Sequence, residues 1–281
     1  MGFNFKLIGY PIKHSMSPWI HNAFLKKSGV AGNYTLFEIK PDDNFEEKLE
    51  QLKDEKTDGF NITVPYKEKI LPYLDEIDET ANEMQAVNTV FCKNGKWIGY
   101  NTDGMGYVRS LKNAHPNLFA TEGKRILIIG SGGAARAIYY ALSALNFTSI
   151  DIANRTRSKA EKIASLGKDK VETAVYSIKQ AEDLLHVYDL IIQTTSVGMK
   201  PKEEQSPLGI TELKKDAVVS DIIYQPIKTN LLQQAEEAGA YIHFGHTMLL
   251  HQALHAFEIW TEASIDIAGM DKELQQILEG R

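Results

Sequence analysis

The sequence contains a single cysteine, Cys92, among its 281 residues. One cysteine cannot form an intramolecular disulfide and cannot build a cysteine-based metal site. Long apolar runs are also missing, because no stretch approaches the roughly 18 residues that a membrane-spanning helix needs. The first residues, MGFNFKLIGYP, are interrupted by Gly9 and Pro11 too early to form the apolar core of a signal peptide. We therefore expect a cytoplasmic protein with no membrane partner.

Basic residues are fewer than acidic residues. The chain has 31 Lys and Arg against 37 Asp and Glu, a net charge of −6. Nucleic-acid binders usually carry a basic patch and a high pI, so we expect no nucleic-acid partner. The apolar content of 43% and charged content of 24% are ordinary for a globular protein. The length allows about two domains of ~150 residues each.

The nine residues Gly59–Lys67, GFNITVPYK, place several polar groups in a short space. They indicate a buried strand that runs into a turn. Asn61 and Thr63 are two residues apart and should project from one face, because side chains alternate along a strand. Pro65 ends the strand, since it cannot donate to the ladder. Lys67 follows near the strand's exit, where an ammonium could move a proton beside bound hydroxyl groups.

Strand-like and helix-like stretches alternate through the first hundred residues. Ser17 and Pro18 predict a helix start, with the serine as N-cap and the proline in the first turn. Apolar residues at helical spacing indicate a helix over 42–56. The dipeptide Asn94-Gly95 predicts a two-residue hairpin between two strands. This pattern indicates an α/β domain.

A different rhythm follows. Arg125–Gly130 is a continuous apolar run, as expected for a parallel strand buried on both faces. Further runs separated by helical stretches are Ser149–Ala153, Asp189–Thr194, Ala217–Ile223 and Tyr241–Phe244. This alternation indicates a doubly wound α/β domain. Beyond it, Thr247–Thr261 reads as one apolar helix that we expect to pack back on the first domain.

The turn after Arg125–Gly130 fits the dinucleotide pattern G-x-G-x-x-A through Gly130, Gly132 and Ala135. The first glycine permits a tight turn, and the second lets the backbone approach a pyrophosphate. Ala135 lets the helix lie close to the strand. The pyrophosphate would lie at the helix N-terminus, where unpaired N–H groups favour negative charge.

The end of the next strand distinguishes the two nicotinamide cofactors. An NAD enzyme usually carries Asp or Glu there to hold the ribose 2′-hydroxyl. Here the strand ends in Asn154-Arg155-Thr156-Arg157, with Lys159 beyond. Guanidinium groups bind phosphate through paired hydrogen bonds. The segment therefore predicts NADP.

A metal site is not expected. His251 and His255 stand four residues apart and could share a helix face. No third ligand or matching carboxylate is evident beside them.

Several ordered motifs together resemble the shikimate dehydrogenase family, over nearly the whole chain from Gly9 to about Trp260. They are GYPIKHSMSP at 9–18, GFNITVPYK at 59–67, AVNT at 86–89, GYNTDG at 99–104, GSGGAARA at 130–137, NRTRSKA at 154–160, TTSVGM at 194–199, DIIYQP at 221–226 and MLLHQ at 248–252. One departure is the loop 244–248, which carries His246 and Thr247 where smaller or more apolar residues are expected. It puts the local loop shape in question.

The resemblance implies a reversible NADPH-dependent reduction of 3-dehydroshikimate to shikimate, with Lys67 and Asp103 as the catalytic pair. It implies that Ser15 and Ser17, helped by Tyr224, bind the substrate carboxylate. The residues implied to hold the substrate's hydroxyl groups, or to reach it from the returning helix, are Asn61, Thr63, Asn88, Asp103 and Gln252. The residues implied at the cofactor are Gly130, Ser131, Gly132, Gly133, Ala134, Ala135, Asn154, Arg155, Thr156, Lys159, Thr194, Ser196, Met199, Ile222 and Gly245.

The expected fold is thus α/β with two domains. A substrate-binding domain would comprise residues 1–103 and 247–281, so that the C-terminal helices return to it. A Rossmann NADP-binding domain would comprise residues 104–246. Three alternatives stay open: a quinate/shikimate dehydrogenase of broader cofactor use, a non-catalytic NADP-binding sensor, and a module that binds a protein partner. The sequence leaves the choice between monomer and homodimer open.

Overall fold

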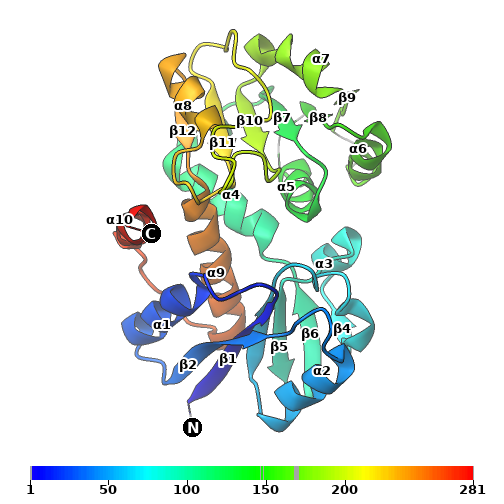
Figure 1. Cartoon of the computed structure of the whole chain (residues 1–281), viewed down its shortest axis with the longest axis vertical. Coiled ribbons are helices and arrows are strands. Elements are labelled where there is room, and N and C mark those ends of the chain that lie inside the picture. The colour runs from blue at the N-terminus through cyan, green and yellow to red at the C-terminus, as the bar shows by residue number, and fades with distance from the viewer. Residues whose placement is uncertain (1, 146, 148, 168–170, 281) are drawn as a thin grey trace. The chain divides into compact units, whose positions relative to one another are not determined.

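The computed structural model describes residues 2–145, 147, 149–167 and 171–280, and its elements are labelled in Figure 1. The chain divides into two compact units, Met1–Thr102 with Gln252–Ile267, and Asp103–His251 with Ala268–Arg281. Each unit is built on its own six-stranded sheet. The predicted α/β fold class is confirmed.

The first unit contains a mixed sheet of order β2-β1-β3-β5-β6-β4. Its strands are β1 (Phe3–Gly9), β2 (Gly32–Glu38), β3 (Gly59–Ile62), β4 (Glu76–Ile77), β5 (Thr89–Lys93) and β6 (Lys96–Tyr100). Its complete helices are α1 (Ser17–Ser28), α2 (Phe45–Asp54) and α3 (Glu79–Met84). β5 and β6 pair antiparallel. Asn94 and Gly95 between them both have positive φ, as a type I′ turn requires, which confirms the predicted hairpin.

The second unit contains a sheet of order β12-β11-β10-β7-β8-β9 whose paired strands all run parallel. Its strands are β7 (Arg125–Ile129), β8 (Ser149–Ala153), β9 (Val175–Tyr176), β10 (Leu190–Gln193), β11 (Val218–Asp221) and β12 (Tyr241–His243). Its helices are α4 (Asp103–Ala114), α5 (Gly133–Ser143), α6 (Arg157–Ala164), α7 (Ile178–Glu182), α8 (Asn230–Glu237) and α10 (Met270–Glu279). α9 (Gly245–Thr261) is divided between the units after His251.

β7 shows why the second sheet is covered on both faces. Ile126 and Ile128 pack in one apolar core, together with residues of α4 and α5. Leu127 and Ile129 point the other way into a second core that includes residues of α8. Alternate side chains of β7 thus pack into two different cores, one on each face of the sheet, as in a doubly wound sheet.

The C-terminal end of the chain differs from the expected domain organisation. Gln252–Ile267 does belong with the first unit, but α10 belongs with the second. Burial lowers the pKa of His246 at the start of α9, and the charges of Asp271 and Glu279 on α10 oppose that shift. α10 therefore lies near enough to the start of α9 for its carboxylates to act on it.

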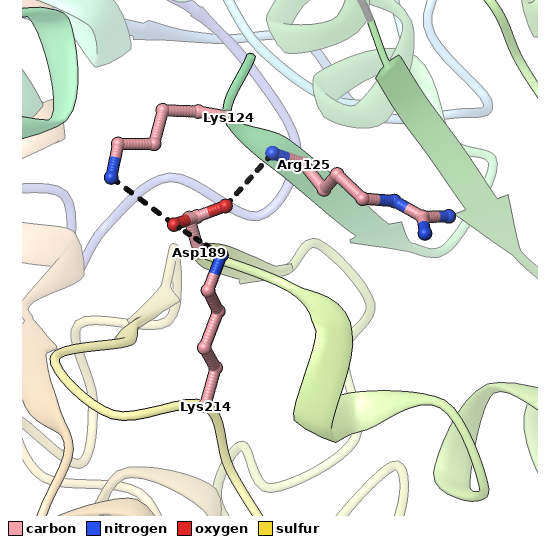
Figure 2. A network of polar contacts seen from close by, with 4 residues as sticks. All are labelled: Lys124, Arg125, Asp189 and Lys214. Carbon is pink, nitrogen blue, oxygen red and sulfur yellow. Dashed lines mark hydrogen bonds and ion pairs between the residues drawn. The ribbon is translucent and has the colours of Figure 1, made fainter. Parts of the chain in front are cut away.

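Asp189 fastens the N-terminal edge of the second sheet, as Figure 2 shows. Its carboxylate accepts hydrogen bonds from the backbone N–H of Arg125 at 3.0 Å and from the ammonium groups of Lys124 at 3.2 Å and Lys214 at 2.9 Å. Burial alone would raise the pKa of Asp189. These donors outweigh burial and hold that pKa below its usual value.

A depressed pKa means that ionised Asp189 stabilises the fold above the unfolded-state pKa, and that this stability is lost as pH falls through the folded-state value. Asp189→Asn is expected to cost about 1–3 kcal/mol at pH 7, as for hydrogen bonds to a charged group. The difference from wild type should shrink below about pH 4. Urea unfolding at pH 7 and at pH 3 measures it, and a constant difference would contradict this role.

Candidate active site

The segment after β3 is a turn that fixes the position of Lys67. The backbone N–H of Tyr66 donates to the Thr63 carbonyl at 3.0 Å, closing the turn. The Lys67 carbonyl accepts the N–H of Val87 at 2.9 Å. The lysine backbone is thus tied to the residue before Asn88, and its side chain is partly exposed.

The expectation that Thr63 lies on the strand is wrong. β3 ends at Ile62, and Thr63 belongs to the following turn. Its N–H still bonds to the Ile8 carbonyl at 3.0 Å, and its methyl group lies close to Gly9, where a β-carbon would not fit. Asn61 remains on the strand and is buried. Thr63 is therefore held at the same end of the sheet by the last residues of β1.

Asn88 is buried and locked to Thr102. Its Oδ1 accepts the Thr102 N–H at 2.8 Å, and its Nδ2 donates to Thr102 Oγ1 at 3.0 Å. Asp103 is the next residue and the first of α4, where a carboxylate is favoured by the helix dipole. Asp103 is itself buried. Thr102 was not singled out from the sequence, although it stands inside the quoted GYNTDG motif.

Ser17 does not cap α1 as predicted. Met16 occupies the N-cap position, and Ser17 is the first helical residue. The Ser15 hydroxyl instead bonds to Ser17 Oγ at 3.2 Å and also accepts the Ser17 N–H at 3.2 Å. The two hydroxyl groups are thus held side by side, which suits one carboxylate.

The glycine turn of the second unit forms an open cradle. Gly130 has φ of 113°, a conformation that favours glycine, and its N–H bonds to the Ala153 carbonyl at 2.8 Å. A β-carbon built on Gly132 or Gly133 would meet no described atom within 4 Å. Ala135 is fully buried against the sheet. Among the described residues, no side chain caps α5, so no side-chain oxygen occupies the position where an anion would accept its first N–H groups.

The segment after β8 presents cationic side chains. Arg155, Thr156 and Lys159 are exposed, and Asn154 Nδ2 holds the turn by donating to the Thr156 carbonyl at 2.8 Å. Arg157 differs, because its guanidinium pairs with Glu161 at 2.8 Å. Arg155 has no ion pair with any described residue. It is therefore the arginine of this segment that can bind an anion without breaking a salt bridge.

The remaining expected cofactor residues follow the C-terminal ends of β10, β11 and β12. Thr194 Oγ1 donates to the Ile129 carbonyl at 2.6 Å, which ties the TTSVGM segment to β7. Ser196 and Met199 are exposed beyond it. A β-carbon on Gly245 would lie 2.4 Å from the carbonyl carbon of Ile222, so this backbone contact requires glycine.

Gln193 supports one of the expected cofactor segments and was not predicted from the sequence. It is fully buried, and its amide nitrogen Nε2 donates to Thr195 Oγ1 and to the Val197 carbonyl, both at 3.0 Å. Its Oε1 accepts the Thr195 N–H at 2.9 Å. It shapes the TTSVGM loop from inside. A polar residue at the end of an apolar strand was the available signal.

The loop departure at His246 and Thr247 has a structural explanation. Both residues lie in the first turn of α9, and His246 is buried. Thr247 Oγ1 donates to the Phe244 carbonyl at 2.6 Å and lies 3.1 Å from Nε2 of His243. The larger side chains are accommodated inside the second unit.

Two expected substrate residues, Tyr224 and Gln252, are partly buried, and burial raises the pKa of the Tyr224 phenol. Tyr224 belongs to the second unit, and Gln252 to the part of α9 assigned to the first. Lys67 lies in the first unit, and Asp103 is the first residue of the second.

In the described ranges, no helix is long and apolar enough to cross a membrane. The same residues contain no group of three or more His, Cys, Asp or Glu side chains placed to hold a metal ion. His255 contacts Glu258, at 3.5 Å.

These features define a class of protein. One unit is a parallel sheet with an open glycine turn of the kind that binds dinucleotides, and the other holds buried Asn and Thr side chains, with the Lys67 backbone bonded to the residue before Asn88. The class is a two-domain oxidoreductase that uses a dinucleotide.

Comparisons with known proteins give the family. The family models matched are "Shikimate dehydrogenase substrate binding domain" over residues 7–90, "Shikimate / quinate 5-dehydrogenase" over 112–222 and "Shikimate 5'-dehydrogenase C-terminal domain" over 245–275. The shikimate dehydrogenase (NADP(+)) of Oceanobacillus iheyensis is 54% identical over 281 residues, covering 100% of both chains. The chain belongs to the shikimate dehydrogenase family, which confirms the resemblance.

Solved structures of the same family share the fold of this chain. A shikimate dehydrogenase in complex with NADP+ superposes with a TM-score of 0.86 at 36% identity, covering 99% of this chain and 96% of the other. A quinate dehydrogenase from Corynebacterium glutamicum in complex with NAD gives a TM-score of 0.87 at 28% identity, covering 100% and 99%. The fold is therefore shared by enzymes named for different substrates and cofactors.

Proposed function

We propose that this protein catalyses the reversible NADPH-dependent reduction of 3-dehydroshikimate to shikimate, a step toward chorismate and the aromatic amino acids, with Lys67 and Asp103 as its catalytic residues. The observation that supports this assignment most strongly is the 54% identity, over the whole chain, to a shikimate dehydrogenase (NADP(+)). Within the structure, the 2.9 Å bond from the Val87 N–H to the Lys67 carbonyl supports the role of the lysine. It holds the lysine beside Asn88, whose partner Thr102 precedes Asp103. A proton donor and hydroxyl-binding groups are thus built on one framework.

The roles of the residues follow from their chemistry. NADPH, when bound, supplies the hydride to the carbonyl carbon. The Lys67 ammonium donates a proton to the carbonyl oxygen in the reduction and takes it back in the oxidation. Asp103 orients the ammonium and accepts a hydrogen bond from a neighbouring substrate hydroxyl.

The substrate is a small anionic ring with several hydroxyl groups. Ser15 and Ser17, with Tyr224, bind its carboxylate in this proposal. The hydroxyl groups are held by Asn61, Thr63, Asn88 and Gln252. A site that hydrogen-bonds such groups rejects analogues without them by ~10⁴-fold or more, because its buried polar groups would be left unpaired.

The cofactor residues fit NADP. The open space over Gly132 and Gly133 at the uncapped start of α5 suits a pyrophosphate. Asn154, Arg155, Thr156 and Lys159 would hold the 2′-phosphate. The loop with Thr194, Ser196 and Met199, together with Ile222 and Gly245, would line the nicotinamide.

The proposed function is tested by mixing purified protein with 3-dehydroshikimate and NADPH, which is expected to form shikimate that chromatography detects. Binding of the cofactor without formation of shikimate would contradict the enzyme assignment and favour a non-catalytic sensor.

Arg155→Ala tests the 2′-phosphate assignment. Loss of the guanidinium is expected to raise KM for NADP about 10- to 100-fold, as for one or two charge-assisted hydrogen bonds. KM for NAD should change little, because NAD has no 2′-phosphate.

Arg157→Ala is the matched control, since Arg157 is already paired with Glu161, and its effect should be smaller. Steady-state kinetics with both cofactors measure these constants. Equal losses for NADP and NAD in Arg155→Ala would contradict the assignment.

The proposed function also implies where the protein acts and which molecules it binds. We assign this enzyme of small-molecule biosynthesis to the cytoplasm. Within the described part of the chain, no helix is long and apolar enough to cross a membrane. Its partners in this proposal are the substrate and NADP, whether it acts as a monomer or a homodimer.

A further inference from the structure

Tyr34 is a buried tyrosine of the first unit, and no sequence motif marked it as part of the site. It lies on β2 with only 2% of its surface exposed. Its hydroxyl donates to Asn61 Oδ1 at 2.8 Å. Ser17 lies beside the same hydroxyl and opposes the effect of burial on its pKa. The phenol thus lies between Ser17 and Asn61 on β3.

The hydrogen bonds continue from Asn61 to Asn88. Asn61 Nδ2 donates to Thr89 Oγ1 at 3.0 Å and to the Asn88 carbonyl at 3.3 Å. Thr89 Oγ1 donates to Asn88 Oδ1 at 3.0 Å. The same Oδ1 accepts the Thr102 N–H. The bonds therefore form one buried path from Ser17 to the residue before Asp103.

This path decides which way the two amides point. An asparagine side chain can present either oxygen or nitrogen to a neighbour. A phenol donating to Asn61 requires Oδ1 on that side, which turns Nδ2 toward Thr89. Burial raises the pKa of Tyr34 well above its usual value, so the phenol keeps its proton.

The ring of Tyr34 is held as firmly as its hydroxyl. It stacks on His21 with ring centroids 4.3 Å apart and an angle of 3° between the planes. Trp260 lies against the same pair, with its ring 5.2 Å from His21. Burial lowers the pKa of His21 to about 3, so this stack is uncharged at neutral pH. This packing holds the Tyr34 ring in one orientation, and so it fixes the position of the hydroxyl group.

We propose that Tyr34 is a positioning residue for substrate binding, which acts by fixing the Asn61 and Asn88 amides relative to the Ser15–Ser17 hydroxyl groups. The inference rests on the proposed function. It gives Asn61 a second role beside holding a substrate hydroxyl group, because Oδ1 and Nδ2 of Asn61 also bond within the protein. Asn61 transmits the position of Tyr34 to Asn88.

Tyr34→Phe removes one oxygen and keeps the ring. Its KM for shikimate is expected to rise about tenfold, because one buried amide loses the donor that orients it. The turnover number should stay within about threefold of wild type, since Lys67 is untouched. KM for NADP should not change. Wild-type oxidation of shikimate, measured alongside, tests the proposed function separately.

Tyr188→Phe is the matched control. Tyr188 is also fully buried, and its hydroxyl donates to Asp151 at 2.8 Å in the second unit. Its loss should lower the urea midpoint without raising KM for shikimate. An unchanged KM in Tyr34→Phe, or an equal rise in both variants, would overturn the proposal.

Thr89 gives a second test at the middle of the path. Thr89→Val keeps the shape but removes the hydroxyl, and it should raise KM for shikimate in the same direction as Tyr34→Phe. Thr89→Ser retains the hydroxyl and should recover most of that loss. Failure of serine to recover affinity would show that packing at this position, and no hydrogen-bond path, sets KM.

Discussion

Replacing Lys67 with alanine is expected to lower kcat by roughly 10²–10⁴-fold, the range for loss of a general acid–base group. KM for shikimate should change little, because the ammonium acts on the oxygen that gains or loses the proton. The backbone bond from Val87 to the Lys67 carbonyl does not depend on the side chain, so the fold should survive. Steady-state kinetics of shikimate oxidation measure both constants.

Lys69→Ala is the matched control for this variant. Lys69 is exposed two residues further along, with its ammonium 4.5 Å from the Phe45 ring. Its loss should alter stability by no more than about 1 kcal/mol and leave kcat near wild type. If Lys67→Ala kept its turnover and lost substrate affinity, Lys67 would be a binding residue only.

Trp260→Ala is expected to cost about 3–5 kcal/mol of stability, as for other buried large aromatic residues. Trp260 is 2% exposed, stacks on Phe5 at 4.5 Å and donates from Nε1 to the Val90 carbonyl at 2.9 Å. The backbone of Gly59 approaches the indole so closely that a β-carbon would lie 2.6 Å from Nε1. The side chain thus joins α9 to β3 and β5 within the first unit.

Urea unfolding followed by circular dichroism checks this prediction. The transition of Trp260→Ala should move down by more than about 1 M relative to wild type. Trp19→Ala is the control, because Trp19 is partly exposed on α1. Equal midpoints for the two variants would mean that α9 contributes little to the first unit.

Local patterns predicted much of the fold because they reflect local physics. The Asn94-Gly95 turn needs two positive φ angles, and few other dipeptides supply them. The apolar run at β7 and the Gly130 turn likewise require burial on two faces and a positive φ. Such requirements are visible in a few consecutive residues.

The failures arose where a distant partner decides the outcome. Ser17 follows the pattern of a helix cap, but its hydroxyl lies with Ser15 and Tyr34. α10 looks like a helix returning to the first domain, yet it lies with the second unit. Tyr34 and Thr89 are ordinary strand residues in sequence. Their importance comes from hydrogen bonds to Asn61, which is 27 or 28 positions away.

The most direct test of the proposed function is the absorbance at 340 nm when purified protein is mixed with shikimate and NADP, compared with NAD and with quinate. We expect rapid NADPH formation from shikimate and weak signals with NAD or quinate. Equal rates with NAD or quinate would contradict the assigned selectivity and indicate a quinate/shikimate dehydrogenase of broader use. No reaction in any combination, with NADPH still bound, would contradict the enzyme assignment itself.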